Sequence, residues 1–566
     1  MRQDNPSQFP KIGVFVCECG ANIGNVVNVD EVVKASEELS GVAFVERNIS
    51  LCSSSGTLRI KESIKKNGVD RVAFAVCSPK NYGSLFESVC EEAGVNKYLV
   101  SFANIREQCA WAHNDSPKEA TRKAIKSVRM AVARLQKSEP LEELEIEVEP
   151  STLIIGGGIS GMTAALCLAN QGFKVFMVEK EPEIGGMLNK LHKLYLTNQD
   201  VSEILSPVIE SVRKHKNIKL FTSASVEEVE GYFGDFDITV SANGGIEKFR
   251  AGTIILATGA DAFEPFGMYG YGEHEGIVTQ LELEQILKQD KLKQPEKVVM
   301  IQCVGARGEG EVTYCSRICC MVAVKNATLI KQLYPDCEVY IIYRDLQTYG
   351  KENEEYQSKA RELGIRFVEY TPDNRPDIVP NGNGKLRVRV HHALLGETLS
   401  IDSDLVVLST PLIQNEGGRE ISKILRVPLG SDGFFREAYM EMRSVALGVN
   451  GVYVCGAAQG PKSIDESITQ AYAAAALAAA PMLIKRVKIP ALNAEVDEEL
   501  CIGCQLCLDL CPFHAIIFEE GKSMVIEAVC RGCGTCAAGC PSRAIVMKGF
   551  KDEQILAEVE AAFRGG

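Results

Sequence analysis

At 566 residues the chain is long enough for about three or four domains, each with its own hydrophobic core. Its net charge of −14 argues against nucleic acid or anionic lipid as a partner, and its N-terminal residues lack the apolar core of a signal peptide. Because Pro481 interrupts the longest apolar stretch, we expect no membrane span and a cytoplasmic location. The 21 cysteines of such a protein then predict metal sites rather than disulfides.

Residues 1–140 are expected to form an α/β domain, with apolar strands that alternate with helical stretches. Five cysteines follow the ends of these strands: Cys17, Cys19, Cys52, Cys77 and Cys109. The carboxyl edge of an open parallel sheet is where ligands bind, so the five would converge on one centre. Their spacing does not tell which of them is spare. The alternative is that they are small buried hydrophobic residues.

A dinucleotide fingerprint opens the next segment, residues 141–295, between a buried strand and a helix. Gly156 permits a tight turn, Gly158 lets the backbone approach a pyrophosphate, and Gly161 lets the helix and strand pack closely. Ile159 and Ser160 begin the helix, whose N-terminus would face the phosphates. A second strand ends in Glu179, which would accept hydrogen bonds from a ribose.

Three further motifs favour FAD over NAD. Glu179 opens the Glu-Lys-x-x-x-x-Gly-Gly arrangement that is common in flavoproteins. A later strand and turn resemble those that close an FAD domain. A strand near the end of the flavin fold resembles the one that reaches the ribityl chain. The residues are Lys180, Gly185, Gly186 and Met187, then Ala257, Thr258 and Gly259, and finally Gly456 and Ala457. Ala457 stands where many flavoproteins have an aspartate, so one usual polar contact is missing.

Residues 296–410 read as a second nucleotide-type α/β domain, after which 411–490 return to the flavin fold. The second domain has no glycine fingerprint for a nicotinamide cofactor, and instead carries Cys303, Cys315, Cys319 and Cys320. Adjacent cysteines fit tetrahedral zinc poorly, whereas an iron–sulfur cube tolerates such spacing. An iron–sulfur site is therefore the favoured interpretation, with structural or redox thiols as the alternative.

A bacterial two-cluster ferredoxin motif fills residues 491–548, and a C-terminal helix follows in 549–566. The run Cys-x2-Cys-x2-Cys-x3-Cys-Pro occurs twice, and in this motif the fourth cysteine of each run ligates the other cluster. One predicted set is Cys501, Cys504, Cys507 and Cys540. The other is Cys530, Cys533, Cys536 and Cys511.

The whole chain resembles the HdrA family of heterodisulfide reductase subunits, in a short form that lacks the inserted ferredoxin domain of long members. The signatures lie at residues 17–24, 77–79, 104–113, 302–305 and 314–320. The resemblance implies a Rossmann-type FAD domain of the thioredoxin-reductase-like class and an atypical [4Fe–4S] cluster on the cysteines at 303–320. It also implies that Lys325 lies near the flavin N5, where a cation would stabilise reduced flavin, and that the N-terminal domain holds a cluster.

We therefore expect an FAD and iron–sulfur electron-transfer subunit of an anaerobic, cytoplasmic complex. Its expected partners are hydrogenase, formate dehydrogenase or ferredoxin on one side and disulfide-reducing B- and C-type or other acceptor subunits on the other, with a homodimer inside the complex. Electron bifurcation is attributed to the long members, and the missing inserted domain removes one path by which electrons enter or leave. The alternatives are a self-contained ferredoxin:NAD(P) oxidoreductase, an electron-input subunit of a quinone-linked or aromatic-ring-reducing complex, and a structural hub.

Overall fold

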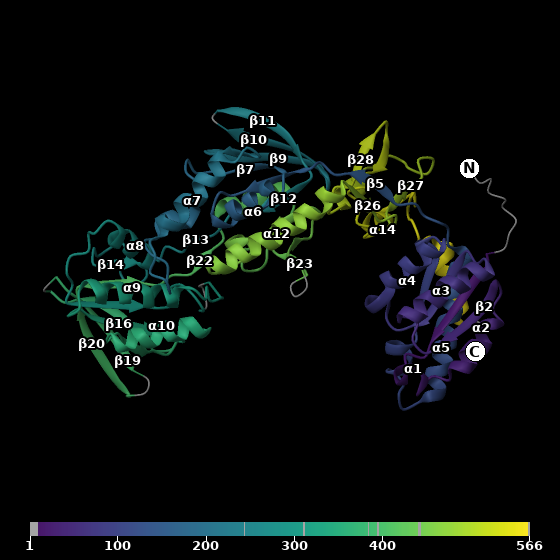
Figure 1. Ribbon diagram of the computed structural model, residues 1–566, viewed down its shortest axis with the longest axis horizontal. Helices are drawn as coiled ribbons and strands as arrows, with labels where there is room; N and C mark the ends of the chain where they lie inside the picture. Colours follow the sequence, from purple (N-terminus) through teal and green to yellow (C-terminus); the bar gives the residue numbers. More distant parts are fainter. Residues whose placement is uncertain are drawn as a thin grey trace. The chain divides into compact units, whose positions relative to one another are not determined.

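The computed structural model describes residues 10–242, 244–308, 312–382, 384–392, 395–439 and 443–563. The chain divides into two compact units, Met1–Glu145 with Lys488–Gly566 and Ile146–Val487 (Figure 1). The N-terminal domain and the ferredoxin-like segment thus share the first unit, and both flavin portions share the second with the nucleotide-type domain. Residues 1–9, for which we expect no signal peptide, lie outside the described part.

A four-stranded parallel sheet forms the centre of the N-terminal domain, in the order β2-β1-β3-β4. Its strands are β1 (Ile12–Cys17), β2 (Val42–Asn48), β3 (Arg71–Val76) and β4 (Val100–Asn104). Side chains alternate between the two faces of a strand, so Val14 packs towards α2 (Val29–Glu37) and α5 (Pro117–Lys137), whereas Phe15 packs towards α3 (Ser54–Asn67) and α4 (Pro79–Ala93). Helices therefore cover both faces, and the carboxyl edge of the sheet stays free for the cysteines.

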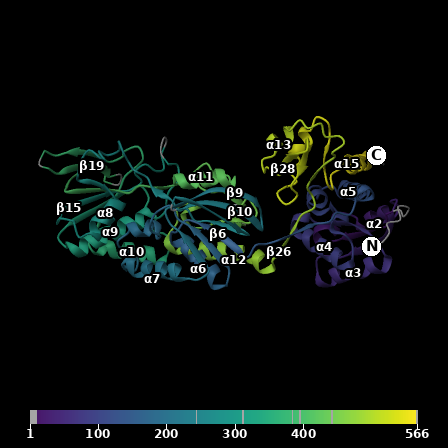
Figure 2. The same cartoon turned by 90° about the horizontal axis from the view of Figure 1, so that it is seen from above.

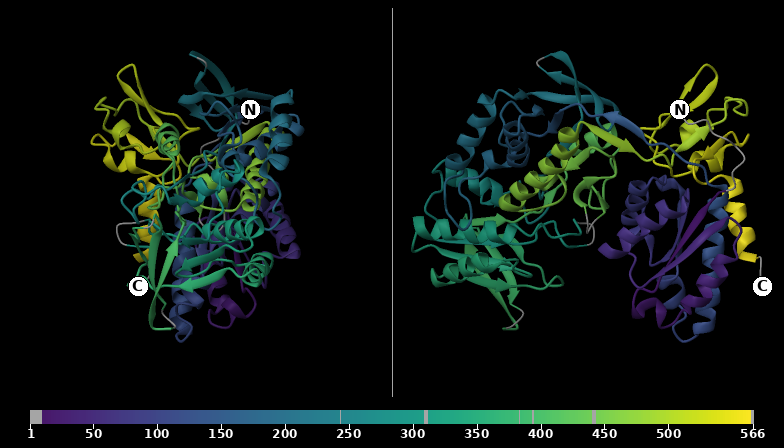
Figure 3. Two further views of the ribbon diagram at one scale, coloured as in Figure 1. Left: turned by 90° about the vertical axis from the view of Figure 1, so that its left-hand side faces the viewer. Right: turned by 45° about the vertical axis from the view of Figure 1, so that its right-hand side comes forward.

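The ferredoxin-like segment has two short hairpin-like sheets and two short helices, α13 (Leu506–Leu510) and α14 (Thr535–Gly539). One sheet pairs β27 (Ala494–Val496) with β30 (Ile545–Met547), and the other pairs β28 (Ile516–Glu519) with β29 (Lys522–Val525). The final helix, α15 (Asp552–Phe563), packs beside α5 (Figure 3). It is held there by an Arg134–Glu558 ion pair of 3.4 Å and a Gln554 Nε2 to Lys137 O hydrogen bond of 3.2 Å.

The flavin portion of the second unit is built on a seven-stranded sheet, in the order β23-β24-β25-β12-β6-β7-β8. Its strands are β6 (Ser151–Ile155), β7 (Lys174–Val178), β8 (Ile218–Phe221), β12 (Thr253–Leu256), β23 (Glu437–Tyr439), β24 (Arg443–Leu447) and β25 (Val452–Val454). One face packs on α6 (Ile159–Asn170), α7 (Val201–Lys214) and α12 (Ile464–Ile484). The other packs on a three-stranded antiparallel sheet of β9 (Ala224–Tyr232), β10 (Asp235–Ala242) and β11 (Gly245–Ala251).

The nucleotide-type portion repeats this plan around a five-stranded parallel sheet, in the order β14-β21-β15-β16-β17. Its strands are β14 (Ile277–Thr279), β15 (Lys297–Ile301), β16 (Glu338–Tyr343), β17 (Arg366–Glu369) and β21 (Leu405–Leu408). Helices α8 (Gln280–Lys288), α9 (Cys319–Leu333) and α10 (Lys351–Glu362) cover one face (Figure 2). The opposite face carries β18 (Asp377–Pro380), β19 (Leu386–His392) and β20 (Glu397–Ser403).

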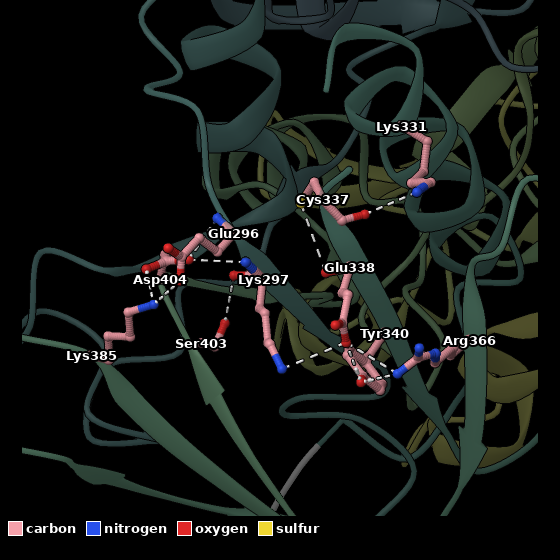
Figure 4. Close-up of polar contacts among 10 residues, drawn as sticks. All are labelled: Glu296, Lys297, Lys331, Cys337, Glu338, Tyr340, Arg366, Lys385, Ser403 and Asp404. Carbon is pink, nitrogen blue, oxygen red and sulfur yellow. Dashed lines mark hydrogen bonds and ion pairs between the residues drawn. The ribbon is translucent and has the colours of Figure 1, made fainter. Parts of the chain in front are cut away.

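Polar side chains close the amino end of this five-stranded sheet (Figure 4). Glu338 pairs with Lys297 at 3.6 Å and with Arg366 at 3.1 Å, and Asp404 accepts hydrogen bonds from the backbone N–H groups of Glu296 and Lys297. These contacts tie neighbouring strands together at the edge opposite the one that binds ligands in such sheets.

Helix α12 differs from the sequence expectation, because it continues through Pro481 to Ile484. Pro481 lies near its C-terminus, where the missing N–H interrupts only the last turns. Among the described residues α12 is the one helix long and apolar enough to cross a membrane by length and composition, but Ala471, Ala475 and Ala478 are buried in the core of the flavin portion. Core packing thus accounts for its apolar composition.

Candidate flavin and cluster sites

The glycine fingerprint adopts the conformation that a dinucleotide loop needs. Gly156 has a φ of +110°, and a Cβ added at Gly161 would lie 1.9 Å from the carbonyl oxygen of Gly156. A Cβ at Gly158 would meet no atom within 4 Å, so its Cα faces open space at the start of α6. A phosphate fits in that space, opposite the free N–H groups of the first helical turn.

A single cavity of about 680 Å³ begins at this loop. Thirteen of the fifteen predicted cofactor-binding residues line it: Gly156, Gly158, Ile159, Ser160, Glu179, Lys180, Gly185, Gly186, Met187, Ala257, Thr258, Gly259 and Ala457. The remaining two, Gly161 and Gly456, serve close packing, because a Cβ on Gly456 would lie 2.1 Å from Ser160 Oγ. The predicted residues thus surround one space of a size suited to an organic cofactor.

Two polar groups along the cavity are positioned for a bound cofactor. Glu179 Oε2 accepts a 2.6 Å hydrogen bond from the Gly157 N–H, and its Oε1 accepts one of 2.9 Å from the Glu181 N–H, which fixes the carboxylate at the end of β7. The buried Thr258 hydroxyl has no hydrogen-bond partner among the described residues. These groups and the glycine loop fit FAD, which supplies two-electron redox chemistry when bound.

The cavity lining also includes residues that the sequence motifs did not indicate. These are Glu284, Ile318, Lys462 and Ser463, and the predicted cluster ligand Cys319 lines the same cavity. Burial lowers the pKa of Lys462 to about 8, and its ammonium donates to Gly456 O at 2.9 Å and to Gln459 Oε1 at 2.7 Å. A cation held by neutral acceptors beside the cavity suits a cofactor that gains negative charge on reduction.

Lys325 lies behind the cavity wall, in the middle of α9. Its ammonium forms an ion pair with Glu284, and both side chains are almost fully buried, with exposures of 2% and 0%. The ammonium also donates to Lys193 O at 3.0 Å. Glu284, not Lys325, is the member of the pair that lines the cavity.

The four cysteines at 303–320 lie in the loop after β15 and at the start of α9, at the carboxyl end of the β15 strand. Cys303 follows β15, Cys315 lies in the next loop, and Cys319 and Cys320 begin α9. Burial and the neighbouring Cys320 and Cys315 thiols, against the lowering effect of Arg307, raise the pKa of the Cys303 thiol to about 11. Each of the four thiols lies close enough to another to influence its ionisation, as a shared cluster requires.

Basic and polar groups surround these four cysteines. Arg307 faces Cys303 and pairs with Asp345 at 2.5 Å, and its Nη1 has no partner among the described residues. The Arg317 N–H donates to Cys315 Sγ at 3.3 Å. The buried amide of Gln302 has neither its donor nor its acceptor satisfied within the described part of the chain. Donors of this kind stabilise the charge of thiolate-bound clusters.

In the N-terminal domain four of the five predicted cysteines lie close enough to influence one another's ionisation. Cys17 has Cys19 and Cys52 as electrostatic neighbours, and Cys77 has Cys19. The Arg106 guanidinium donates to Cys19 Sγ at 3.4 Å. This proximity of thiols from three loops is what a cluster site needs.

Cys109 belongs to the core on the α2 and α5 side of the sheet, whereas Cys17 belongs to the core on the α3 and α4 side. Cys109 is fully buried in the core formed with α5, and its thiol faces the Asn104 carbonyl at 3.6 Å. Burial raises the pKa of Cys109, and its polar neighbours are Ser127 and Lys123. Its surroundings are those of a small hydrophobic core residue.

The ferredoxin-like segment brings its eight cysteines together in two sets. One small cavity is lined by Cys501, Cys504, Cys507 and Cys540. A second is lined by Cys511, Cys530, Cys533 and Cys536. Each set combines three cysteines of one run with the fourth of the other. The donor sets therefore fit two [4Fe–4S] clusters with crossed ligation.

The crossed arrangement predicts which of the two clusters is lost when a single ligand is changed. Cys511→Ser should remove the cluster of Cys530, Cys533 and Cys536, about four iron atoms, and leave the cluster of Cys504 in place. Iron analysis with EPR of Cys511→Ser and Cys504→Ser would distinguish the two clusters, with Cys167→Ser as a control that keeps all iron. Loss of the same cluster in the first two variants would contradict the crossing.

Two family models match the chain. The pyridine nucleotide-disulphide oxidoreductase model matches residues 150–478, and the 4Fe-4S dicluster domain model matches residues 494–547. These matches confirm the predicted fold class and the two kinds of cofactor, FAD and [4Fe–4S] clusters. A crystal structure of thioredoxin reductase from T. acidophilum is 20% identical and covers 59% of this chain and 100% of its own, with a TM-score of 0.42.

Curated relatives match nearly the whole chain. The HdrA-type subunit of H(2):CoB-CoM heterodisulfide,ferredoxin reductase from Methanothermobacter marburgensis is 39% identical over 645 aligned residues, with 98% of this chain and 97% of the relative covered. The corresponding subunit of H(2)/formate:CoB-CoM heterodisulfide,ferredoxin reductase from Methanococcus maripaludis is 34% identical, with 91% and 92% covered. With the cavity and the cysteine sets described above, these matches show that the chain is an electron-transferring oxidoreductase subunit that belongs to the HdrA family of heterodisulfide reductases.

Proposed function

We propose that this subunit exchanges electrons between its flavin and iron–sulfur clusters inside a larger cytoplasmic complex. A hydrogenase, a formate dehydrogenase or ferredoxin would supply electrons, and a disulfide-reducing or other acceptor subunit would receive them. The names of the relatives support these partners, since they include H2, formate, ferredoxin and the CoB-CoM heterodisulfide. We also propose that the chain forms a homodimer within the complex.

The observation that carries the proposal is the shared cavity. Gly158 and Glu179 line it at the nucleotide-binding loop, and Cys319 lines it as well. A flavin takes up two electrons together and can release them singly, whereas a cubane cluster carries one electron at a time. A cysteine-bound cluster in contact with this cavity would therefore let the protein convert between two-electron and one-electron transfer. Bifurcation would use the same parts, with the electron pair divided between two cluster paths.

The proposed ligand sets follow from the proximity of the thiols. Cys303, Cys315, Cys319 and Cys320 would bind the cluster next to the flavin. Cys17, Cys19, Cys52 and Cys77 would bind the N-terminal cluster, which leaves Cys109 as the spare residue. Lys325 would act on the flavin through Glu284, because the ammonium neutralises the charge of this residue of the cavity lining.

Quantification of iron and flavin, with EPR, in the anaerobically purified chain tests the proposal. We expect one FAD and about four cubanes per chain, since four cysteine sets supply four ligands each. Addition of NADH should leave the flavin oxidised, and a reduced iron–sulfur donor should reduce it. Only two cubanes, together with direct reduction of the flavin by NADH, would contradict the proposal.

A further inference from the structure

Arg317 joins the cysteine loop to a distant part of the flavin site. It lies between Cys315 and Cys319, and its backbone has a φ of +63°. Its guanidinium donates to both carboxylate oxygens of Glu466, from Nη1 to Oε1 at 3.1 Å and from Nη2 to Oε2 at 3.0 Å. It also donates to Pro461 O at 3.0 Å and to Tyr349 Oη at 2.9 Å.

Glu466 is itself fixed at the N-terminus of α12. It forms a capping box with Ser463, in which Glu466 Oε2 accepts the Ser463 N–H at 2.9 Å and Ser463 Oγ accepts the Glu466 N–H at 3.3 Å. Burial acts to raise the pKa of Glu466, but the hydrogen bonds from Ser463 and Arg317 outweigh it and hold the pKa below its usual value. The carboxylate thus stays charged and accepts from both partners.

Both ends of this contact border the same cavity. Ile318 and Cys319, which follow Arg317, line it, and so do Lys462 and Ser463, which precede Glu466. The bidentate contact therefore connects the wall that carries a proposed cluster ligand with the wall that carries a cation beside the flavin.

We propose that Arg317 and Glu466 form a clamp that fixes the cysteine loop relative to the flavin, and so sets the rate of electron exchange between flavin and cluster. The inference rests on the proposed cluster at residues 303–320. Arg317 and Glu466 are positioning residues, since neither exchanges electrons. Each electron that leaves the reduced flavin reduces one cluster by one electron, and the clamp changes only the distance and orientation over which it moves.

The chemistry of the pair favours this role. A guanidinium and a carboxylate match in a planar, two-bond geometry that restricts both position and rotation, which a single-point contact cannot do. The αL conformation of Arg317 is disfavoured for a residue with a side chain, and the four side-chain hydrogen bonds hold it. Because the two side chains are 40% and 37% exposed, the pair contributes little to stability, and its loss should leave the protein folded.

The test compares variants of the full, cofactor-loaded protein. Arg317→Ala and Glu466→Gln remove the bidentate contact. Arg317→Lys keeps the positive charge but cannot form the planar contact with two hydrogen bonds. Arg389→Ala is the matched control, because Arg389 forms a similar contact with Asp377 on β18 and β19, away from the cavity. Photoreduction of the flavin, followed by absorbance, measures how fast electrons reach the cluster.

We expect the rate to fall about tenfold or more in Arg317→Ala and Glu466→Gln, since a misplacement of about 1 Å can cost a positioned reaction up to about a hundredfold. Arg317→Lys should recover only part of it, and Arg389→Ala should match the wild type. Ethylguanidinium added to Arg317→Ala should restore the rate, whereas ethylammonium should not. FAD and iron contents should remain unchanged.

Unchanged rates in Arg317→Ala and Glu466→Gln, with a full set of cofactors, would overturn the clamp. Equal rescue by both amines would also overturn it, since charge alone would then suffice. A wild-type protein without the cluster at 303–320 would instead overturn the proposed function, so the two failures can be told apart. If Arg317→Ala loses cofactor, Glu466→Gln still tests the clamp. It breaks the same contact but changes neither the side-chain volume nor any residue next to the cysteines.

Discussion

Glu284→Gln is expected to lower the free energy of unfolding of the second unit by about 3–5 kcal/mol, because it leaves the buried Lys325 ammonium without its counter-charge. The exposures of the two side chains are 0% and 2%, so water cannot replace the lost partner. Lys325 would keep only neutral acceptors, such as the Lys193 carbonyl at 3.0 Å. Lys325→Met should have an effect of similar size, since it leaves the Glu284 carboxylate with the His192 N–H at 2.9 Å as its main donor.

The double variant Glu284→Gln, Lys325→Met separates this explanation from a general loss of packing. If uncompensated charge is the cause, the double variant should be more stable than either single variant, because no buried charge is left. Additive destabilisation would contradict this interpretation. Lys297→Met at the polar edge shown in Figure 4 is the control, and should cost less than about 1 kcal/mol because the Lys297–Glu338 pair is 37% exposed on both sides.

The measurement needs a probe inside the second unit. Trp111, the one tryptophan, belongs to the first unit, so its fluorescence would not report the transition. Flavin fluorescence or hydrogen exchange of α9 during a urea titration would report it. All variants should be compared at saturating FAD, because bound cofactor adds its own stabilisation.

The same pair predicts a pH dependence of stability. Burial lowers the pKa of Lys325 below its ordinary value of 10.5, and the nearby Glu284 only partly offsets this. The unfolded chain therefore binds more protons than the folded chain between the two pKa values, and the free energy of unfolding should rise with pH in that window. In Glu284→Gln the carboxylate no longer raises the pKa of Lys325. The increase in the free energy of unfolding should therefore begin at a lower pH in this variant. Urea titrations of both proteins at a series of pH values would measure it.

The local motifs could be predicted well from the sequence because their geometry depends on short spacing. Gly161 packs against the turn of the fingerprint itself, at the Gly156 carbonyl oxygen, and the two ferredoxin runs contain all the predicted ligands of both clusters. In each case the chemistry is determined by residues a few positions apart, or by two copies of one motif. The predicted classes of cofactor are confirmed for this reason.

Contacts between distant residues could not be predicted in this way. Arg317 and Glu466 are 149 positions apart, and Glu284 and Lys325 are 41 apart. No local pattern connects them; only the packing of α8, α9 and α12 around one cavity does. The position of Cys109 could not be predicted either. The spacing of the cysteines along the chain does not reveal that Cys109 packs in the core with α5.

The second large effect is expected at the glycine loop, where two substitutions of equal size should have different consequences. Gly161→Ala places a Cβ 1.9 Å from the Gly156 carbonyl oxygen, a backbone atom that cannot move without displacing the turn. We expect the apoprotein to lose about 3 kcal/mol or more of stability through this overpacking, and FAD binding to be lost as well.

Gly158→Ala should leave the apoprotein unchanged, because the added Cβ would meet no protein atom within 4 Å. The methyl group would instead occupy the space next to the helix N-terminus where the pyrophosphate must approach. Loss of one charge-assisted hydrogen bond would weaken FAD binding by about 1.5–3 kcal/mol, roughly ten- to a hundredfold. Gly448→Ala, which also meets no atom within 4 Å, is the control with full affinity and stability.

Titration of the apoprotein with FAD, together with thermal unfolding without FAD, separates the two effects. Gly161→Ala should show both weaker FAD binding and a lower unfolding temperature. Gly158→Ala should show only the weaker FAD binding. Equal FAD affinity in Gly158→Ala and the wild type would mean that the phosphates do not pass the first turn of α6, and the cofactor would then have to enter the cavity in another orientation. The combination of results therefore tests where the nucleotide lies, and not merely whether the domain folds.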